Sequence, residues 1–214
     1  VSHNHVIHSR DIVVWYSSGN RFEHNVVEHG RYGTHFMYSH HNELVGNRYL
    51  ANIVGVFVMY SRDVELRRNL IMDSSGSSGM GLGLKESGDI VAVENRFIHN
   101  RTGAYLDTSP LQMDNHNRFE RNVFRLGEVG VRFHSSPRRN RFVENGFRGN
   151  QTPVRVDGGG HARDVAWRGN YFEDYQGYDL DGDGVGDVPY ELRSISTDLV
   201  GRYPKLSFFR GTPA

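Results

Sequence analysis

Short runs of alternating hydrophobic and polar residues recur along this chain at intervals of about 22 to 27 residues. Asparagines mark the interval, each a few residues after a hydrophobic position: Asn25, Asn47, Asn69, Asn95, Asn122, Asn145 and Asn170. The steps between successive members are 22, 22, 26, 27, 23 and 25 residues. A repeat of this length predicts stacked structural units, in which each residue lies above its counterpart in the next unit.

Two hydrophobic columns accompany the asparagines. One stands two residues after each Asn: Val27, Tyr49, Ile71, Phe97, Phe124, Phe147 and Phe172. The other stands three residues before it: Phe22, Leu44, Leu66, Ala92, Phe119, Phe142 and Trp167. A second signature runs from Gly to Ser and occupies residues 33–39, 55–61, 81–87, 103–109 and 130–136. Each repeat therefore holds three short segments that alternate with period two, which predicts strands rather than helices.

Three short strands per coil, stacked coil on coil, predict an all-β fold, the right-handed parallel β-helix. Asn suits the corners because it tolerates a left-handed backbone and because stacked amides can hydrogen-bond along a column. The Leu-x-x-Leu-x-Leu pattern of leucine-rich repeats is absent. We expect repeats over residues 1–175, and an acidic loop with a C-terminal capping segment over residues 176–214 of the same domain.

Alternation also assigns the two faces of the Gly-to-Ser strands. The interior positions are Thr34, Val56, Leu82, Ala104 and Val131, with Phe36, Val58, Leu84, Leu106 and Phe133. The outward positions are His35, Phe57, Gly83, Tyr105 and Arg132, with Met37, Met59, Lys85, Asp107 and His134. The preceding coil, aligned on Ser17, adds Val13 and Trp15 to the outward set.

One end of this outward face is soft and apolar. Neighbouring strands lie about 4.8 Å apart, so Met37 and Met59 should be stacked neighbours with His35 beside them. Thioether and imidazole groups suit Cu(I) and are poor ligands for hard cations. We therefore predict an exposed, transient Cu(I) site at these three residues, with His40 and His41 as second choices. The bland alternative is an apolar patch covered by a partner, and we expect Trp15 and Phe57 to face that partner.

The other end of the face is charged and offers a different chemistry. Lys85, Asp107, Arg132 and His134 could serve a uronate lyase or epimerase, with Arg132 neutralising the carboxylate and Lys85 or His134 as the base. The alternative is a solvated face without catalytic chemistry. Separately, we expect Lys85, Tyr105 and Asp107 to face a partner. No second carboxylate lies at matching depth, so the pair that a sugar hydrolase needs is not indicated.

An acidic loop follows the last repeat. Asp179, Asp181, Asp183 and Asp187 alternate with glycines, in the manner of the first part of a calcium-binding EF-hand loop. The twelfth position is Tyr190, so the bidentate Glu of a complete loop is missing. The pattern predicts a structural Ca²⁺ of modest affinity, or a tight Asp/Gly turn without an ion.

The amino-acid composition excludes several functional classes and kinds of site. Charges balance at zero, which argues against general nucleic-acid binding. No Cys is present, which excludes disulfides and thiolate metal sites. No run approaches the roughly 20 apolar residues of a membrane span, and no signal peptide is recognisable. The chain opens at Val1 inside repeat-like sequence, so we expect further N-terminal coils to precede it.

The C-terminal run of residues 169–190 resembles the C-terminal signature of the NosD family, as do the segments 55–61 and 81–87. The resemblance implies a periplasmic, non-catalytic β-helix that works with an ABC transporter, whose ATPase and permease are of the NosF and NosY type. It also implies a role in copper-site maturation of nitrous oxide reductase, with copper supplied by the chaperone NosL. A carbohydrate-binding or lyase-type β-helix is the alternative.

Overall fold

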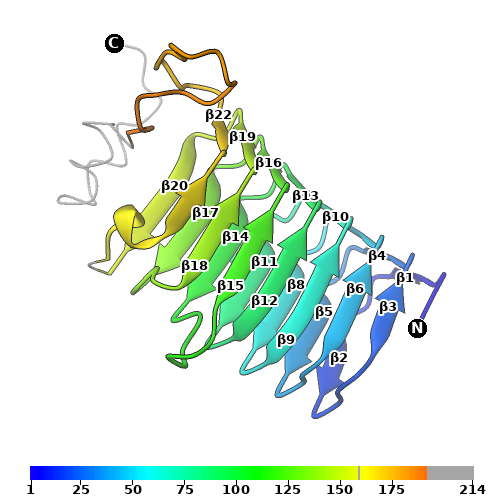
Figure 1. Ribbon diagram of the computed structural model, residues 1–214. Coiled ribbons are helices and arrows are strands. Elements are labelled where there is room, and N and C mark those ends of the chain that lie inside the picture. Colours follow the sequence, from blue (N-terminus) through cyan, green and yellow to red (C-terminus); the bar gives the residue numbers. More distant parts are fainter. Residues whose placement is uncertain (159, 192–214) are drawn as a thin grey trace. The chain divides into compact units, whose positions relative to one another are not determined.

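Each coil of the chain contributes one short strand to each of three parallel sheets, as the computed structural model shows for residues 1–158 and 160–191 (Figure 1). The predicted all-β, right-handed parallel β-helix is confirmed. The first sheet has the order β1 (His5–Ile7), β4 (Val26–Glu28), β7 (Arg48–Leu50), β10 (Leu70–Met72), β13 (Arg96–Ile98), β16 (Val123–Arg125), β19 (Gly146–Arg148) and β22 (Tyr171–Phe172).

The other two sheets hold seven strands each. The second sheet has the order β2 (Asp11–Trp15), β5 (Tyr32–Met37), β8 (Val54–Met59), β11 (Met80–Lys85), β14 (Thr102–Asp107), β17 (Val129–His134) and β20 (Thr152–Asp157). The third sheet has the order β3 (Arg21–Glu23), β6 (Asn42–Val45), β9 (Arg62–Arg67), β12 (Gly88–Val93), β15 (Asn117–Glu120), β18 (Asn140–Val143) and β21 (Ala166–Arg168). The one helix of the described residues is the 3-10 turn η1 (Ala162–Asp164), which is far too short to cross a membrane.

The core consists of the hydrophobic columns that the sequence predicts. The residues two after each Asn pair with one another along the first sheet, and all are buried. Phe97, Phe124, Phe147 and Phe172 stack ring on ring, with centroids 4.8 to 5.1 Å apart. The interior positions of the second sheet are buried as well. The predicted division into inner and outer columns is therefore confirmed for the interior.

The asparagines form a continuous hydrogen-bonded ladder. Each side-chain amide donates to the Oδ1 of the next Asn, over 2.9 to 3.1 Å, from Asn25 to Asn170. The expectation of a left-handed backbone at the asparagines is wrong, because the residue before each one has the positive φ. His24 and Glu94, with φ of 53° and 57°, are examples. The turn is made one residue earlier, and the Asn side chain then points inward and satisfies buried backbone groups.

Glycine is the second residue of five strands of the second sheet, β5, β8, β11, β14 and β17, because no side chain fits there. A Cβ on Gly33 would lie 2.4 Å from the carbonyl oxygen of Gly55 and 2.6 Å from the Tyr49 ring. Gly33 and Thr34 are both buried, so the alternation breaks at this point and Tyr32 lies on the outer face. Because of this break, the Tyr32 ring lies on the same outer face as the ring of His35.

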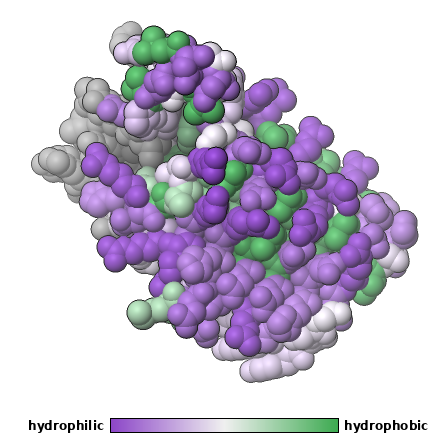
Figure 2. Space-filling model, viewed as in Figure 1, coloured by the Kyte–Doolittle hydropathy of each residue, from purple (hydrophilic) through white to green (hydrophobic). Residues whose placement is uncertain are grey.

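The chain divides into two units, Val1–Asp174 and Tyr175–Ala214. The first unit contains the β-helix, and the second contains the acidic loop. The prediction that both segments belong to one domain stays a prediction. The capping role predicted for the C-terminal segment falls largely on residues 192–214, which lie outside the described residues. The face of the molecule in Figure 2 is mostly hydrophilic, with smaller hydrophobic areas between the polar side chains.

Candidate metal site

The structure brings His35, Met37 and Met59 together on the outer side of the second sheet. Strands β5 and β8 pair in parallel, and Met37 lies opposite Met59 as the repeat predicts. The His35 ring reaches toward the following coil, where its Nε2 lies 3.1 Å from the Sδ of Met59. An imidazole nitrogen and a thioether sulfur are thus already adjacent.

His35 is nevertheless buried, with only 8% of its surface exposed. Its ring is 4.9 Å from that of Tyr32 and 5.5 Å from that of Phe57, and these two rings stack on each other at 5.6 Å. The predicted exposure of the site is therefore wrong for the imidazole. Met37 and Met59 are half-buried and form the accessible part of the group.

Burial lowers the pKa of His35, and the positive charge of Arg31 lowers it further, while the nearby carboxylate of Asp11 raises it. Arg31 donates from Nε to Asp11 over 2.9 Å, and this hydrogen bond holds the pKa of Asp11 below its ordinary value. The guanidinium of Arg31 also lies 4.7 Å from the centre of the Tyr32 ring. The lowered pKa of His35 favours the neutral imidazole, whose lone pair can bind a metal ion.

The rings of Tyr32 and Phe57 form an aromatic cage over His35, and glycine in the outer column makes room for Phe57. A Cβ at Gly83 would meet the Phe57 ring at 2.3 Å and the Met80 sulfur at 3.3 Å. Phe57 therefore lies over Gly83, with the Met80 thioether beside it. Sequence reasoning missed Met80 and Tyr32, because both precede the Gly-to-Ser segments from which the alternation was counted.

His40 and His41, the second choices, lie past the next corner and hydrogen-bond elsewhere. The Nδ1 of His40 accepts the backbone N–H of Arg62 over 3.2 Å, and burial lowers the pKa of His40. His41 lies 3.3 Å from the carboxylate of Asp63. His40 lines a shallow hollow with Tyr60 and other residues of that corner. The two histidines thus do not join the His35–Met59 pair.

The predicted partner-facing residues all lie on the outer columns of the second sheet. Trp15 is 62% exposed and lies opposite Met37 in the register. Lys85 lies between Met59 and Asp107 in one column, and Phe57 and Tyr105 are half-buried in the other. The structure adds a tyrosine stack that the sequence reasoning missed: Tyr16, Tyr38 and Tyr60, with ring centroids 5.1 and 4.9 Å apart. Its signal is a Tyr directly before three successive corner serines. Tyr16 and Tyr38 are exposed, and Tyr60 is half-buried.

Arg132, the predicted uronate binder, is already engaged. Its Nε donates to Asp157 over 2.6 Å, and Arg155 donates to the same carboxylate over 2.9 Å. The Arg132 guanidinium also lies 5.6 Å from the centre of the Tyr105 ring. The positive charge of Arg132, which would have to neutralise a uronate carboxylate, is therefore already paired with Asp157.

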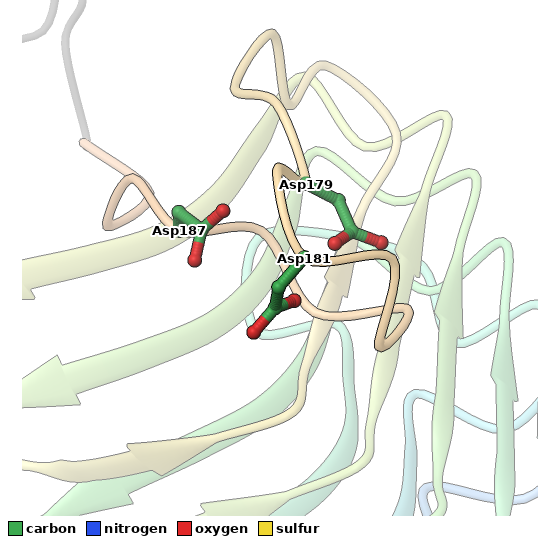
Figure 3. A group of neighbouring side chains, drawn as sticks. All are labelled: Asp179, Asp181 and Asp187. Carbon is green, nitrogen blue, oxygen red and sulfur yellow. The ribbon is translucent and has the colours of Figure 1, made fainter.

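The acidic loop brings three of its four predicted ligands together. Oxygen atoms of Asp179, Asp181 and Asp187 lie within 4.8 Å of one another, with Asp179 and Asp181 on one arm and Asp187 on the returning arm (Figure 3). Hydrogen bonds from the backbone N–H of Gly184 and Gly182 lower the pKa of Asp179. The fourth residue, Asp183, is not in this group and accepts the backbone N–H of Val185 over 2.7 Å.

A family model described as periplasmic copper-binding protein (NosD) matches residues 1–177. The chain belongs to the NosD family. Two curated NosD relatives, from Pseudomonas aeruginosa and Stutzerimonas stutzeri, are each named as a probable ABC transporter binding protein. They are 34% and 32% identical to the chain over 102 residues, which is 46% of this chain. The match covers only 23% of each NosD relative, so the chain spans a small part of their length.

Among solved structures, the periplasmic alginate epimerase AlgG is similar to 74% of this chain over 46% of its own, at 16% identity and a TM-score of 0.45. A likeness this distant carries no functional argument. The NosD family descriptions name copper and a transporter, and they name no enzymatic activity.

Proposed function

We propose that this NosD chain binds Cu(I) transiently, with His35 and Met59 as the first two ligands and Met37 as the third. The observation that carries the proposal is the 3.1 Å separation between His35 Nε2 and Met59 Sδ. The description of the family as copper-binding supports the choice of metal. A neutral imidazole and thioethers in an apolar cage select a soft ion over hard cations.

The geometry needs only a small adjustment to admit an ion. Metal–ligand distances of roughly 2.1 Å for nitrogen and 2.3 Å for sulfur, as in zinc sites, would give an angle of roughly 90° at an ion shared by the two atoms. A modest outward rotation of Met59 opens this angle, and Met37 lies on the neighbouring strand to close the site. Because the thioethers are half-buried and the imidazole is buried, an ion would enter and leave on the methionine side.

Membership of the NosD family supports a proposal about the wider role. We propose that the chain acts in the periplasm as a non-catalytic accessory protein in copper delivery to nitrous oxide reductase, together with an ABC transporter. Its partners would be an ATPase and permease of the NosF and NosY type, the chaperone NosL, and the reductase. Trp15, Phe57, Lys85, Tyr105 and Asp107 share the outward face of the copper site and would contact the donor or the recipient of the ion. No observation favours the lyase or epimerase alternative, since Arg132 is paired with Asp157.

Anaerobic Cu(I) titration against a chromophoric chelator tests this proposal. We expect the wild type to bind one ion, and a Met37→Leu/Met59→Leu variant to bind it at least about ten-fold more weakly, since Leu keeps the volume and removes the sulfur. The matched control is Met72→Leu/Met113→Leu, which removes two thioethers outside the site and should leave the affinity unchanged. Equal affinity in all three proteins contradicts the proposed site.

We also propose that the acidic loop binds a structural Ca²⁺ through Asp179, Asp181 and Asp187. Carboxylate oxygens this close together repel one another, and a hard cation relieves the repulsion. Terbium luminescence measures binding to such loops. An Asp179→Asn/Asp187→Asn variant should lose the signal, whereas Asp183→Asn, whose carboxylate lies outside the group, should keep most of it. Equal signals from both variants, or none from the wild type, contradict this ion site.

A further inference from the structure

The outer face of the first sheet differs from the other two faces in its charges. In its three-residue strands from β4 to β19 the central side chain is buried and the flanking ones point outward. From β7 to β22 these outward positions hold four exposed arginines, Arg48, Arg96, Arg125 and Arg148, and no acidic residue. Earlier in the sheet the one outward carboxylate, Glu28, is hydrogen-bonded to His5 over 2.6 Å.

None of these four arginines has an ion pair among the described residues of the chain. Arg148 lies over the ring of Tyr171 at 4.7 Å, on the same face. Arg125 and Arg148 lie directly opposite each other in neighbouring strands, an arrangement that is destabilising for like charges. Three of the acidic residues that flank this face are bonded elsewhere: Asp73 to His99, Glu94 to Arg121, and Glu173 to the N–H of Gly149.

Arginines on the other faces are mostly paired. On the third sheet, Arg21 pairs with Glu23 and Glu43, Arg67 with Glu65, and Arg118 with Glu120. On the second sheet, Arg132 and Arg155 share Asp157. Arg141 and Arg168, near the end of the third sheet, also have no ion pair among the described residues. Only on the first sheet, however, is every outward arginine unpaired among the described residues.

Hydrophobic side chains fill the space between these arginines. Leu50, Met72 and Ile98 lie in one column, in register from strand to strand, and the column continues into Arg125. Leu70 lies between Arg48 and Arg96 in the other column. All of these apolar residues are half-buried and form a partly exposed apolar strip between the arginines.

We propose that the first-sheet face binds the surface of an anionic phospholipid bilayer. The planar guanidinium group of arginine matches the geometry of a phosphate group. Lipid phosphates would supply the negative counter-charges that the four unpaired arginines lack on this face. Stable attachment to a bilayer takes two signals, and this face supplies both a basic cluster and an apolar strip. Eight strands at about 4.8 Å spacing give a platform roughly 34 Å long, which spans several lipid headgroups. The proposal is independent of the copper site.

Flotation with lipid vesicles tests the proposal directly. The chain is mixed with vesicles of phosphatidylglycerol and phosphatidylcholine, or of phosphatidylcholine alone. We expect binding to the anionic vesicles only, and a decrease when NaCl is raised from about 0.05 to about 0.5 M. Inorganic phosphate, added at the ionic strength of a matched NaCl sample, should release no more protein than NaCl does. Specific release by free phosphate would show a phosphate-ion site and overturn the bilayer assignment.

Two matched variants locate the surface. Arg48→Gln/Arg96→Gln/Arg125→Gln/Arg148→Gln should lose binding, by roughly five-fold per arginine. Arg21→Gln/Arg118→Gln/Arg141→Gln/Arg168→Gln removes the same charge from the third-sheet face and should bind nearly as the wild type does. Equal losses in both variants would mean that only net charge matters and would overturn the assignment to this face. If the first variant does not fold, as seen in its circular dichroism, binding of the wild type to neutral and anionic vesicles alike overturns the proposal on its own.

Discussion

At the scale of single residues, His35 shows how a side chain can point outward and still be buried. Period-two alternation places it on the outer face, and the structure keeps it there, but Tyr32 and Phe57 cover it. Tyr32 can do so because the alternation breaks at Gly33, where a side chain would collide with the next coil. A histidine in such a cage is held neutral and close to Met59, which suits a ligand better than a fully solvated imidazole does.

The lowered pKa of His35 makes a prediction about stability. Its folded pKa lies below the ordinary value of about 6.5 for histidine, so on acidification the unfolded chain takes up this proton first. The neutral imidazole therefore contributes to the stability of the folded state. This contribution is fully present above the unfolded pKa of about 6.5 and is lost as the pH falls through the folded pKa. Between about pH 7.5 and about pH 5.5 we expect the melting temperature of the wild type to fall more than that of His35→Gln.

The control for this experiment is His116→Gln, which alters an exposed histidine far along the chain. Its melting temperature should follow the wild-type dependence on pH. A His35→Gln protein whose melting temperature falls as steeply as that of the wild type would show that burial of His35 has no energetic consequence.

At the scale of the structural element, the asparagine ladder explains why the coils keep their register. Asn95 is fully buried, and its side chain makes four hydrogen bonds: Oδ1 accepts from the backbone and the side chain of Asn69, and Nδ2 donates to Leu66 O and to Asn122 Oδ1. Each interior member of the ladder thus satisfies groups of the coils on both sides. The repeat predicted the ladder, but it did not show that the preceding residue makes the turn, because residues at that position share no sequence pattern.

Replacing an interior ladder residue should therefore cost much more than replacing the last one. We expect Asn95→Ala to lose about 3 kcal/mol of unfolding free energy, since several buried polar groups are left unsatisfied. Asn170 is half-buried at the end of the ladder. We expect Asn170→Ala to lose roughly half as much unfolding free energy as Asn95→Ala does. Urea unfolding followed by circular dichroism measures both, and equal losses would contradict the account of the ladder.

At the scale of the whole molecule, a net charge of zero conceals three faces of different chemistry. The sequence was sufficient for the fold, for the buried columns, and for the pairing of Met37 with Met59, because all three follow from the period. It was insufficient for the cover over His35 and for the pairing of Arg132 with Asp157, because these depend on side-chain conformations. It was insufficient for the unpaired arginines of the first sheet as well, because ion pairing also depends on side-chain conformations.

The central claim is that His35 and Met59 share one Cu(I) ion, and X-ray absorption at the copper edge tests it most directly. With one equivalent of Cu(I) bound, the account predicts a first shell containing one imidazole nitrogen together with thioether sulfur. In His35→Ala the nitrogen should disappear, and in Met59→Leu the sulfur contribution should fall. A shell of nitrogen and oxygen atoms alone, or a spectrum that both variants leave unchanged, would contradict the claim.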